Sequence, residues 1–179
     1  MEELLENRMA ESGIIVIQSA LNSDITNQII LTLLKWNTSN PKKELQLYIS
    51  STTNDYLNII TIYDVMQSIQ NPISGYAIGL VAGCATLLLA GCSKGKRYAL
   101  KNTEIALSEV SGFLSNGANQ ETEIAIAAKE TTIQKETFES LLAKHTSQKV
   151  EKIHEDCVEE RSFTAKEACE YGLIDKVLE

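Results

Sequence analysis

Small residues fill segment 79–85, which reads Gly-Leu-Val-Ala-Gly-Cys-Ala and lies between two apolar stretches. Residues 73–78 precede it and residues 86–90 follow it, a pattern that predicts a strand, a tight turn and a buried helix. Hydrolases place a serine nucleophile at such a turn, because the backbone N–H groups at the helix N-terminus stabilise an oxyanion. Here the turn offers Gly83, which has no side chain that could attack a carbonyl.

An alternative hypothesis moves the chemistry to Cys84, with His145 or His154 as the activating base. A residue beside a strand-to-helix turn directs its side chain elsewhere, usually inward, and both histidines lie in helical sequence. The cysteines lack CxxC spacing, and the histidines have no ligand-like spacing to them. We therefore expect no metal site, no cofactor, and buried free thiols at Cys84, Cys92, Cys157 and Cys169.

The composition is that of one globular domain, residues 1–179. Hydrophobic residues make up 44% of the chain and charged residues 22%, which are ordinary values for a folded domain. The net charge of −8 disfavours binding to a nucleic-acid backbone. No apolar run reaches the roughly 20 residues of a membrane span, and the acidic residues 1–6 do not resemble a signal or transit peptide. We expect neither nucleic acid nor a membrane as a partner.

Strands and helices alternate through the first two thirds of the chain, which indicates an α/β fold with mainly parallel pairing and helical crossovers. Apolar and β-branched runs predict strands at residues 13–17, 45–49, 73–78, 97–100, 104–107 and 173–178. Helices are predicted from Ser23 or Asp24 onward, and at residues 57–69, 86–90, 120–144, 150–160 and 164–172.

Two of these helices carry apolar stripes. The first predicted helix places on one face Ile25, Ile29, Leu33 and Trp36. The long helix at residues 120–144 carries Ile124, Ala127, Ala128, Ile133, Phe138 and Leu141. Since this helix is longer than the average one, we expect it to project beyond the core and to serve assembly.

Four segments, in order along the chain, resemble the proteolytic subunit of the Clp protease, the ClpP family. They are residues 4–8 (Leu-Leu-Glu-Asn-Arg), 62–67 (Ile-Tyr-Asp-Val-Met-Gln), 95–102 (Gly-Lys-Arg-Tyr-Ala-Leu-Lys-Asn) and 170–175 (Glu-Tyr-Gly-Leu-Ile-Asp). The similarity covers nearly the whole chain. It implies a ClpP/crotonase-like fold of repeated ββα units, assembly into heptameric rings, and pairing with an AAA+ unfoldase.

Active members of this family use a Ser-His-Asp triad, and all three positions differ here. The turn that reads Gly-x-Ala-Ala-Ser-Met-Gly in the family has Gly83 at the nucleophile. By the same resemblance, Ser108 replaces the histidine and Glu160 replaces the aspartate. The oxyanion loop, normally Asn-Ser-Pro-Gly-Gly-Ser, reads Ser-Ser-Thr-Thr-Asn-Asp, with Thr53 and Asn54 where the family uses glycine.

Each departure removes a chemical function. Gly83 cannot form an acyl-enzyme, and the hydroxyl of Ser108 does not titrate near neutral pH as an imidazole does. The β-carbons of Thr53 and Asn54 disfavour the positive-φ backbone that aims an N–H at an oxyanion. The sequence therefore predicts a catalytically inactive ring subunit of an ATP-dependent Clp protease complex, with no catalytic residue.

This pattern is similar to that of the non-proteolytic ClpP paralogues called ClpR, which occur in cyanobacteria, plastids and apicoplasts. Frequent Ile, Asn and Lys, with only three arginines, hint at an AT-rich coding genome. We therefore expect the stroma of a plastid or apicoplast, with any transit peptide absent from this sequence. The alternative is the cytoplasm of a cyanobacterium.

The resemblance assigns about residues 108–145 to a handle that joins two rings back to back. The loop before the long helix is longer than usual around residues 115–119, and a short insertion, residues 9–13, precedes the first strand. Glu159 replaces an arginine that, by resemblance, helps to bridge the rings, and such a charge reversal disfavours the contact. We expect a heptameric ring more firmly than a symmetric double ring of this chain alone.

The resemblance also implies a docking pocket for the unfoldase at the rim of the ring. Its residues would be Gln46, Tyr48, Tyr76, Ile78, Tyr98, Leu100 and Leu178. Aromatic and aliphatic side chains there suit an apolar anchor, although Gln46 stands where the family has an apolar or aromatic residue. An alternative interpretation is that these alternating residues belong to the core or to a subunit contact.

Other functions stay open beside the inactive ring subunit. A residual or relocated peptidase using Cys84 would cleave peptides and react with electrophilic probes. A crotonase-like acyl-CoA enzyme shares the implied fold, but it needs two backbone N–H groups aimed at a thioester oxygen. A third possibility is a scaffold ring that never meets active ClpP subunits.

Overall fold

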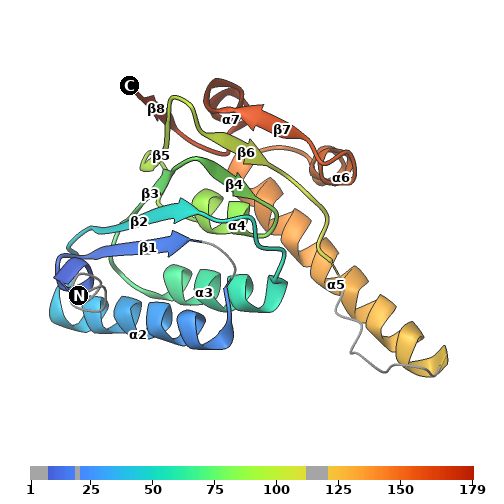
Figure 1. Ribbon diagram of the computed structural model, residues 1–179, viewed down its shortest axis with the longest axis horizontal. Coiled ribbons are helices and arrows are strands. Elements are labelled where there is room, and N and C mark those ends of the chain that lie inside the picture. Colours follow the sequence, from blue (N-terminus) through green and yellow to red (C-terminus); the bar gives the residue numbers. More distant parts are fainter. Residues whose placement is uncertain (1–7, 19–20, 112–120) are drawn as a thin grey trace.

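A parallel β-sheet runs through the centre of the computed structural model, which describes residues 8–18, 21–111 and 121–179 (Figure 1). Five strands pair in the order β1-β2-β3-β5-β8, and every pair is parallel. They are β1 (Ile14–Gln18), β2 (Leu45–Ser50), β3 (Ile73–Ala77), β5 (Arg97–Leu100) and β8 (Lys176–Leu178). The parallel pairing that the sequence predicts is confirmed.

A second sheet has three short strands in the order β4-β6-β7, namely β4 (Leu80–Ala82), β6 (Glu104–Ala106) and β7 (Ser162–Thr164). The β4–β6 pair is parallel and the β6–β7 pair is antiparallel. The chain passes from β3 into β4 and then into helix α4, and later from β5 into β6 and then toward helix α5. The protein is therefore a mixed α/β fold in which the chain crosses between the two sheets from β3 to β6.

The helices are α2 (Ser23–Ser39), α3 (Tyr56–Ser68), α4 (Ala85–Ala90), α5 (Glu121–Thr146), α6 (Val150–Val158) and α7 (Ala165–Tyr171). Helix α2 begins at Ser23, as the sequence predicts, but its cap is Asn22 and not Ser23 or Asp24, because the Asn22 side chain accepts from the Ile25 N–H. Thr164 and Glu167 form the predicted capping box of α7, and Gly172 ends that helix in a left-handed conformation at φ 98°.

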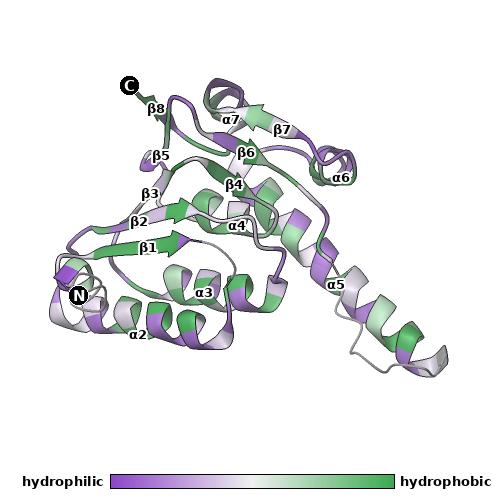
Figure 2. Ribbon diagram, viewed as in Figure 1, coloured by the Kyte–Doolittle hydropathy of each residue, from purple (hydrophilic) through white to green (hydrophobic). Residues whose placement is uncertain are grey.

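The core lies between the central sheet and the helices that cover one of its faces. Along β2, Leu45, Leu47 and Ile49 are buried, whereas Gln46 and Tyr48 on the opposite face are half-buried. Figure 2 shows hydrophobic strands beside helices of mixed hydropathy. Helix α4 is buried along its whole length, because all its residues are apolar or small. Among the residues that the structure describes, no helix covers the other face of the sheet.

Helix α5 leaves the body of the protein over its first half (Figure 1). Ile124, Ile126 and Ile133 are 48%, 58% and 54% exposed, while Phe138 is only 1% exposed. The predicted apolar stripe therefore meets the core only from Phe138 onward. In the first helix, similarly, Ile25 is exposed and the buried face is Thr26, Ile29, Leu33 and Trp36. Grouped exposed apolar side chains of the kind on α5 mark an interaction surface.

Three strands differ from the sequence-based expectation. Residues 79–85 were expected to form a tight turn, but Gly79 at φ 66° redirects the chain so that β4 forms there and pairs with β6. Strand β7 was not predicted, because three residues carry too weak a pattern. The expected strand at 173–178 is only β8, because Leu173 and Ile174 are buried in the turn after α7.

Arg97 and Asp175 form a buried ion pair that ties β5 to the C-terminal segment. The Arg97 Nη2 and Nε atoms donate to the two Asp175 oxygens at 2.6 and 2.9 Å, and Nη1 donates to the carbonyls of His145 and Gly172. Burial alone would raise the pKa of Asp175, but the hydrogen bonds and charge of Arg97 and the Gly95 N–H outweigh it and lower the pKa. The side chain of Arg97 therefore joins the ends of α5 and α7 to the central sheet.

Replacing Asp175 with Asn should lower the free energy of unfolding by about 3 kcal/mol at pH 7, because it leaves the charge of Arg97 buried without a partner. Urea unfolding measures this change. Since the folded-state pKa of Asp175 is depressed, its contribution exists above the unfolded-state pKa of about 4 and is lost as the pH falls through the folded value.

The difference between wild type and Asp175→Asn should therefore shrink as the pH falls from 5 to 3. Lys96→Ala is the matched control, because it breaks the pair with Glu44, whose side chains are 38% and 37% exposed. That change should cost far less, because solvent screens an exposed ion pair. Equal effects of the two substitutions would contradict a structural role for the buried pair.

Candidate functional site

The second sheet brings positions 83, 108 and 160 to one of its ends. Gly83 directly follows β4, and its N–H donates to the carbonyl of Ala106 at 3.1 Å. Strand β6 pairs Ala106 with Ser162 in antiparallel register. Continuing that register by two residues places Ser108 opposite Glu160. Gly83 is thus bonded to the end of β6, while Ser108 lies two residues after Ala106 and Glu160 two residues before its partner Ser162.

The turn at Gly83 depends on the absence of a side chain. Gly83 has φ 62°, a conformation that L-residues rarely adopt. A β-carbon built on it would lie 1.8 Å from Oδ1 of Asn54 and 2.9 Å from the carbonyl oxygen of Thr53. Thr86 holds the turn from the other side, because its hydroxyl donates to the Gly83 carbonyl at 2.7 Å. The amide of Asn54 therefore occupies the space that a nucleophile side chain would need.

Asn54 also bonds to Ser108, which the family resemblance places at the general base. The hydroxyl of Ser108 donates to Oδ1 of Asn54 at 3.1 Å, so this amide oxygen lies beside both Gly83 and Ser108. The loop around Asn54 is held by the bond from the N–H of Asp55 to Oγ1 of Thr53 at 3.1 Å. Neither Thr53 nor Asn54 adopts a positive φ. The loop therefore places the side chain of Asn54 beside Gly83 and Ser108.

Glu160 is exposed and has φ 50°, at the end of α6. Its neighbour Arg161 makes the charged contact of this corner, donating to Oδ1 of the buried Asp156 at 3.0 Å. Burial would raise the pKa of Asp156, but bonds from Tyr171, Lys152 and Arg161 outweigh it and lower the pKa. The buried, hydrogen-bonded carboxylate at this corner is therefore Asp156. Its partners Tyr171, Lys152 and Arg161 stabilise the fold.

Cys84 and the two histidines lie in separate environments. Cys84 is fully buried, and that burial raises the pKa of its thiol to about 12. The Tyr63 hydroxyl is 2.8 Å from Nε2 of His145, and His154 Nδ1 is 3.0 Å from the Glu139 carboxylate. The His154 side chain is 49% exposed and has this partner on α5. Each histidine is thus engaged by a residue other than Cys84.

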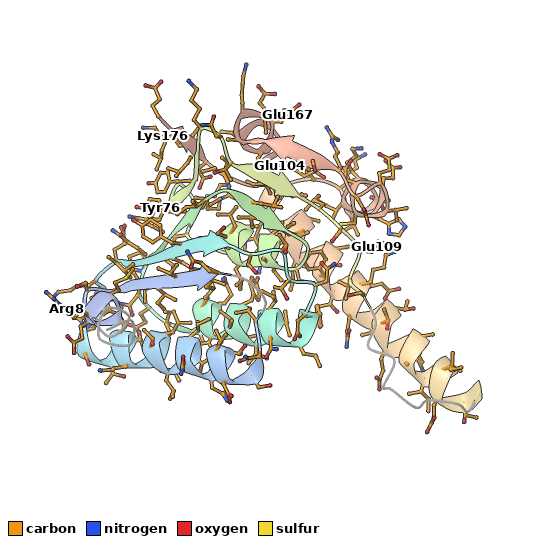
Figure 3. The ribbon with its side chains drawn as sticks, viewed as in Figure 1. Arg8, Tyr76, Glu104, Glu109, Glu167 and Lys176 are labelled. Atoms are coloured by element: carbon orange, nitrogen blue, oxygen red, sulfur yellow. The ribbon has the colours of Figure 1, made fainter. Side chains whose placement is uncertain are left out.

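Three tyrosines form a ladder on the open face of the central sheet. Tyr48, Tyr76 and Tyr98 occupy matched positions on β2, β3 and β5. Their rings stack with centroids 4.6 and 5.1 Å apart. Figure 3 shows Tyr76 at the side of the sheet, with Lys176 at the end of the same face. Around the ladder, half-buried or exposed, lie Gln46, Ile78, Leu100 and Leu178. These residues are not part of the core of this chain.

Two polar contacts also lie on this face. The Tyr48 hydroxyl donates to Oε1 of Gln46 at 3.2 Å, and Lys96 forms its ion pair with Glu44 at the edge.

Where the chain leaves β6 toward α5, Glu109 pairs with Lys135 of α5 (Figure 3). The longer loop expected around residues 115–119 lies outside the described residues.

A comparison with protein families matches the chain to the Clp protease family over residues 2–179. The match covers almost every residue, and the chain belongs to this family. Its members are normally serine peptidases, and they form ring oligomers. The family resemblance that the sequence motifs predict is therefore confirmed.

Over residues 8–18, 21–111 and 121–179, no helix is both long and apolar enough to cross a bilayer. In the same ranges, no group of three or more His, Cys, Asp or Glu side chains is placed to hold a metal ion. All four cysteines are free thiols, of which Cys169 is the only one that is not buried.

Adding a methyl group at Gly83 should test the contact with Asn54. Gly83→Ala should lower the free energy of unfolding by about 1–2 kcal/mol for its positive φ and about 1–3 kcal/mol more for the overlap. Gly95→Ala is a matched control, because Gly95 has φ 83° and no atom within 4 Å of its added β-carbon. It should show the conformational cost alone.

In an Asn54→Gly background, the cost of Gly83→Ala should fall toward that of Gly95→Ala, since the overlapping amide is gone. The Thr53 carbonyl oxygen, 2.9 Å from the added β-carbon, accounts for the remaining difference. Thermal or urea unfolding of the four variants measures this coupling. Equal costs of Gly83→Ala with and without Asn54 would show that the amide does not fill this space.

Proposed function

We propose that this chain is a catalytically inactive ring subunit of an ATP-dependent Clp protease complex, of the ClpR type. The observation that carries the proposal is the position of the Asn54 amide, in contact with Gly83 and hydrogen-bonded to Ser108. A site that has lost only its nucleophile would leave a space there. This site is instead filled by a side chain from the loop that should form the oxyanion hole.

The remaining groups supply no step of acyl transfer. The hydroxyl of Ser108 is a hydrogen-bond donor to Asn54 and has no proton-accepting role near neutral pH. Glu160 is exposed and has no imidazole to orient. Because Thr53 and Asn54 lack positive φ values, the loop does not adopt the glycine geometry with which active family members aim N–H groups at an oxyanion.

The same geometry argues against a relocated cysteine peptidase. A thiol with a pKa raised to about 12 is almost wholly protonated at pH 7, and the thiolate is the nucleophile. Cys84 is buried and each histidine is bonded to another residue, Tyr63 or Glu139. A crotonase-like acyl-CoA enzyme is disfavoured by the oxyanion loop for the reason given above.

The surfaces support a role in assembly. We assign the projecting half of α5, within the handle at about residues 108–145, to contact between rings, because its isoleucines are exposed. We assign the tyrosine ladder and its neighbours to docking of an AAA+ unfoldase, because they form an aromatic surface outside the core. In this proposal the chain forms heptameric rings, alone or with active ClpP subunits, in a plastid or apicoplast stroma or in a cyanobacterium.

Peptide turnover tests the proposal. The purified chain, free of active partners, should show no cleavage of a fluorogenic peptide above the buffer rate. Gly83→Ser should also be inactive, because Asn54 blocks its hydroxyl and no general base is present. An active ClpP measured alongside is the positive control. Turnover by the wild type, or by Gly83→Ser alone, would contradict the proposal.

The assembly part is measured separately by native mass spectrometry. The expected species is a heptamer, and co-expression with active ClpP should give mixed rings if the chain completes an active particle. An obligate monomer at micromolar concentration would contradict a ring subunit, whatever the peptidase assay shows.

A further inference from the structure

The last turn of α5 is tied to two other elements through one residue, His145. The Tyr63 hydroxyl of α3 lies 2.8 Å from Nε2 of the imidazole, and the two rings meet edge to face with centroids 5.6 Å apart. On the backbone side, Nη1 of Arg97 in β5 donates to the His145 carbonyl at 3.2 Å. His145 therefore joins the end of the projecting helix to α3 and to the central sheet.

The direction of the bond between Tyr63 and His145 follows from burial. Tyr63 is 3% exposed, and a buried hydroxyl needs an acceptor for its proton. The acceptor that the described residues offer is Nε2 of His145. We therefore assign the hydroxyl as the donor, which leaves the lone pair on Nε2 and the ring proton on Nδ1. This arrangement requires a neutral imidazole.

The charges around the imidazole also favour its neutral form. Burial lowers the pKa of His145, and the charges of Lys144 and Arg97 lower it further. The carboxylate of Asp175 is engaged by Arg97, and Asp64, which follows Tyr63 in α3, is exposed. A proton added to the ring in its present position would therefore meet two positive groups and no carboxylate of its own.

A hollow of about 350 Å³ borders His145. This volume is many times the roughly 30 Å³ of a water molecule, so it has room for the ring and for water that hydrates a charge. None of the described residues lining the hollow is acidic, and the Cys92 thiol stays uncharged because burial raises its pKa to about 12. The polar and charged residues that line it with His145 are Gln67, Asn71, Ser93, Lys94, Arg97, Lys144 and Ser147.

We propose that His145 is an acid-sensitive latch between α3 and α5. The neutral ring accepts the Tyr63 hydroxyl and holds the last turn of α5 against α3. A protonated ring carries a hydrogen on Nε2 and can no longer accept, so the Tyr63 proton loses its partner. The imidazolium then turns into the hollow, where water hydrates it, and the last turn of α5 is released. The latch concerns how α5 is held and does not rest on the proposed function.

The pH range of the latch follows from the direction of the pKa shift. The pKa of His145 is lower in the closed latch than the ordinary value of 6.5 of a released or unfolded chain, so the closed state binds fewer protons. The closed latch therefore has its full stability above pH 6.5 and loses it as the pH falls from there toward the folded-state pKa. Within that interval each pH unit favours release by up to about tenfold.

Two measurements on the assembled, full-length chain test the latch. Exchange of the imidazole C2 hydrogen, followed by mass spectrometry, gives a titration midpoint for each histidine, and the midpoint of His145 should lie below pH 6.5. Amide hydrogen exchange of residues 139–146, corrected for the intrinsic rate, should rise by about three- to tenfold between pH 7.5 and pH 5.5.

Matched variants assign the response to one histidine. His145→Gln keeps a side-chain acceptor that does not titrate, so the rise in exchange should disappear. His154→Gln removes the other histidine, whose Nδ1 lies 3.0 Å from the Glu139 carboxylate, and should keep the rise. Tyr63→Phe removes the bond that favours the neutral ring, so it should move the His145 midpoint up toward pH 6.5 and speed exchange already at pH 7.5.

Three outcomes would overturn the latch. A His145 midpoint at or above pH 6.5 would show that the charged ring is not disfavoured in place. A lowered midpoint without faster amide exchange would show protonation without release. An equal rise in the wild type and in His145→Gln would assign the pH response to other groups. The wild-type titration decides the first of these even if a variant fails to fold.

Discussion

The packing of the Asn54 side chain against the bare α-carbon of Gly83 is the constraint on which this account depends. With φ 62° and an amide oxygen 1.8 Å from where a β-carbon would be, position 83 accepts glycine and little else. The same oxygen accepts the hydroxyl of Ser108, so three segments share one contact. In the proposed inactive subunit, loss of the nucleophile is therefore coupled to the shape of the loop, and reversing it requires more than one substitution.

The body around the filled site is held by strong polar contacts that do not involve position 83. Arg97 and Asp175 join the central sheet to the C-terminal segment, and Asp156 ties α6 to Arg161 and Tyr171. The exposed surface, by contrast, keeps apolar side chains on α5 and on the open sheet face. The chain thus has a well-held fold and exposed apolar surfaces, while the Asn54 side chain occupies the space beside Gly83. We proposed a role in assembly on these grounds.

Much of the fold could be predicted because the pattern of each long element is local. The apolar alternation of β2, the capping box at Thr164 and the uniformly apolar α4 all specify their structure within a few residues. Strands β4 and β7 could not be predicted, since each has only three residues and depends on pairing with β6. The assignment of positions 83, 108 and 160 to the triad stays a prediction from the motifs, and the contact of Asn54 with Gly83 depends on long-range packing that one sequence does not reveal.

The claim that the site is filled, and not merely altered, is tested most directly by covalent chemistry. The purified chain, free of active partners, is incubated with a serine- and cysteine-reactive β-lactone and its intact mass is measured. We expect an unchanged mass, because no activated nucleophile is present and the Cys84 thiol is buried. A single stoichiometric acyl adduct, mapped by peptide sequencing to residues 79–85 or to Ser108, would contradict the account.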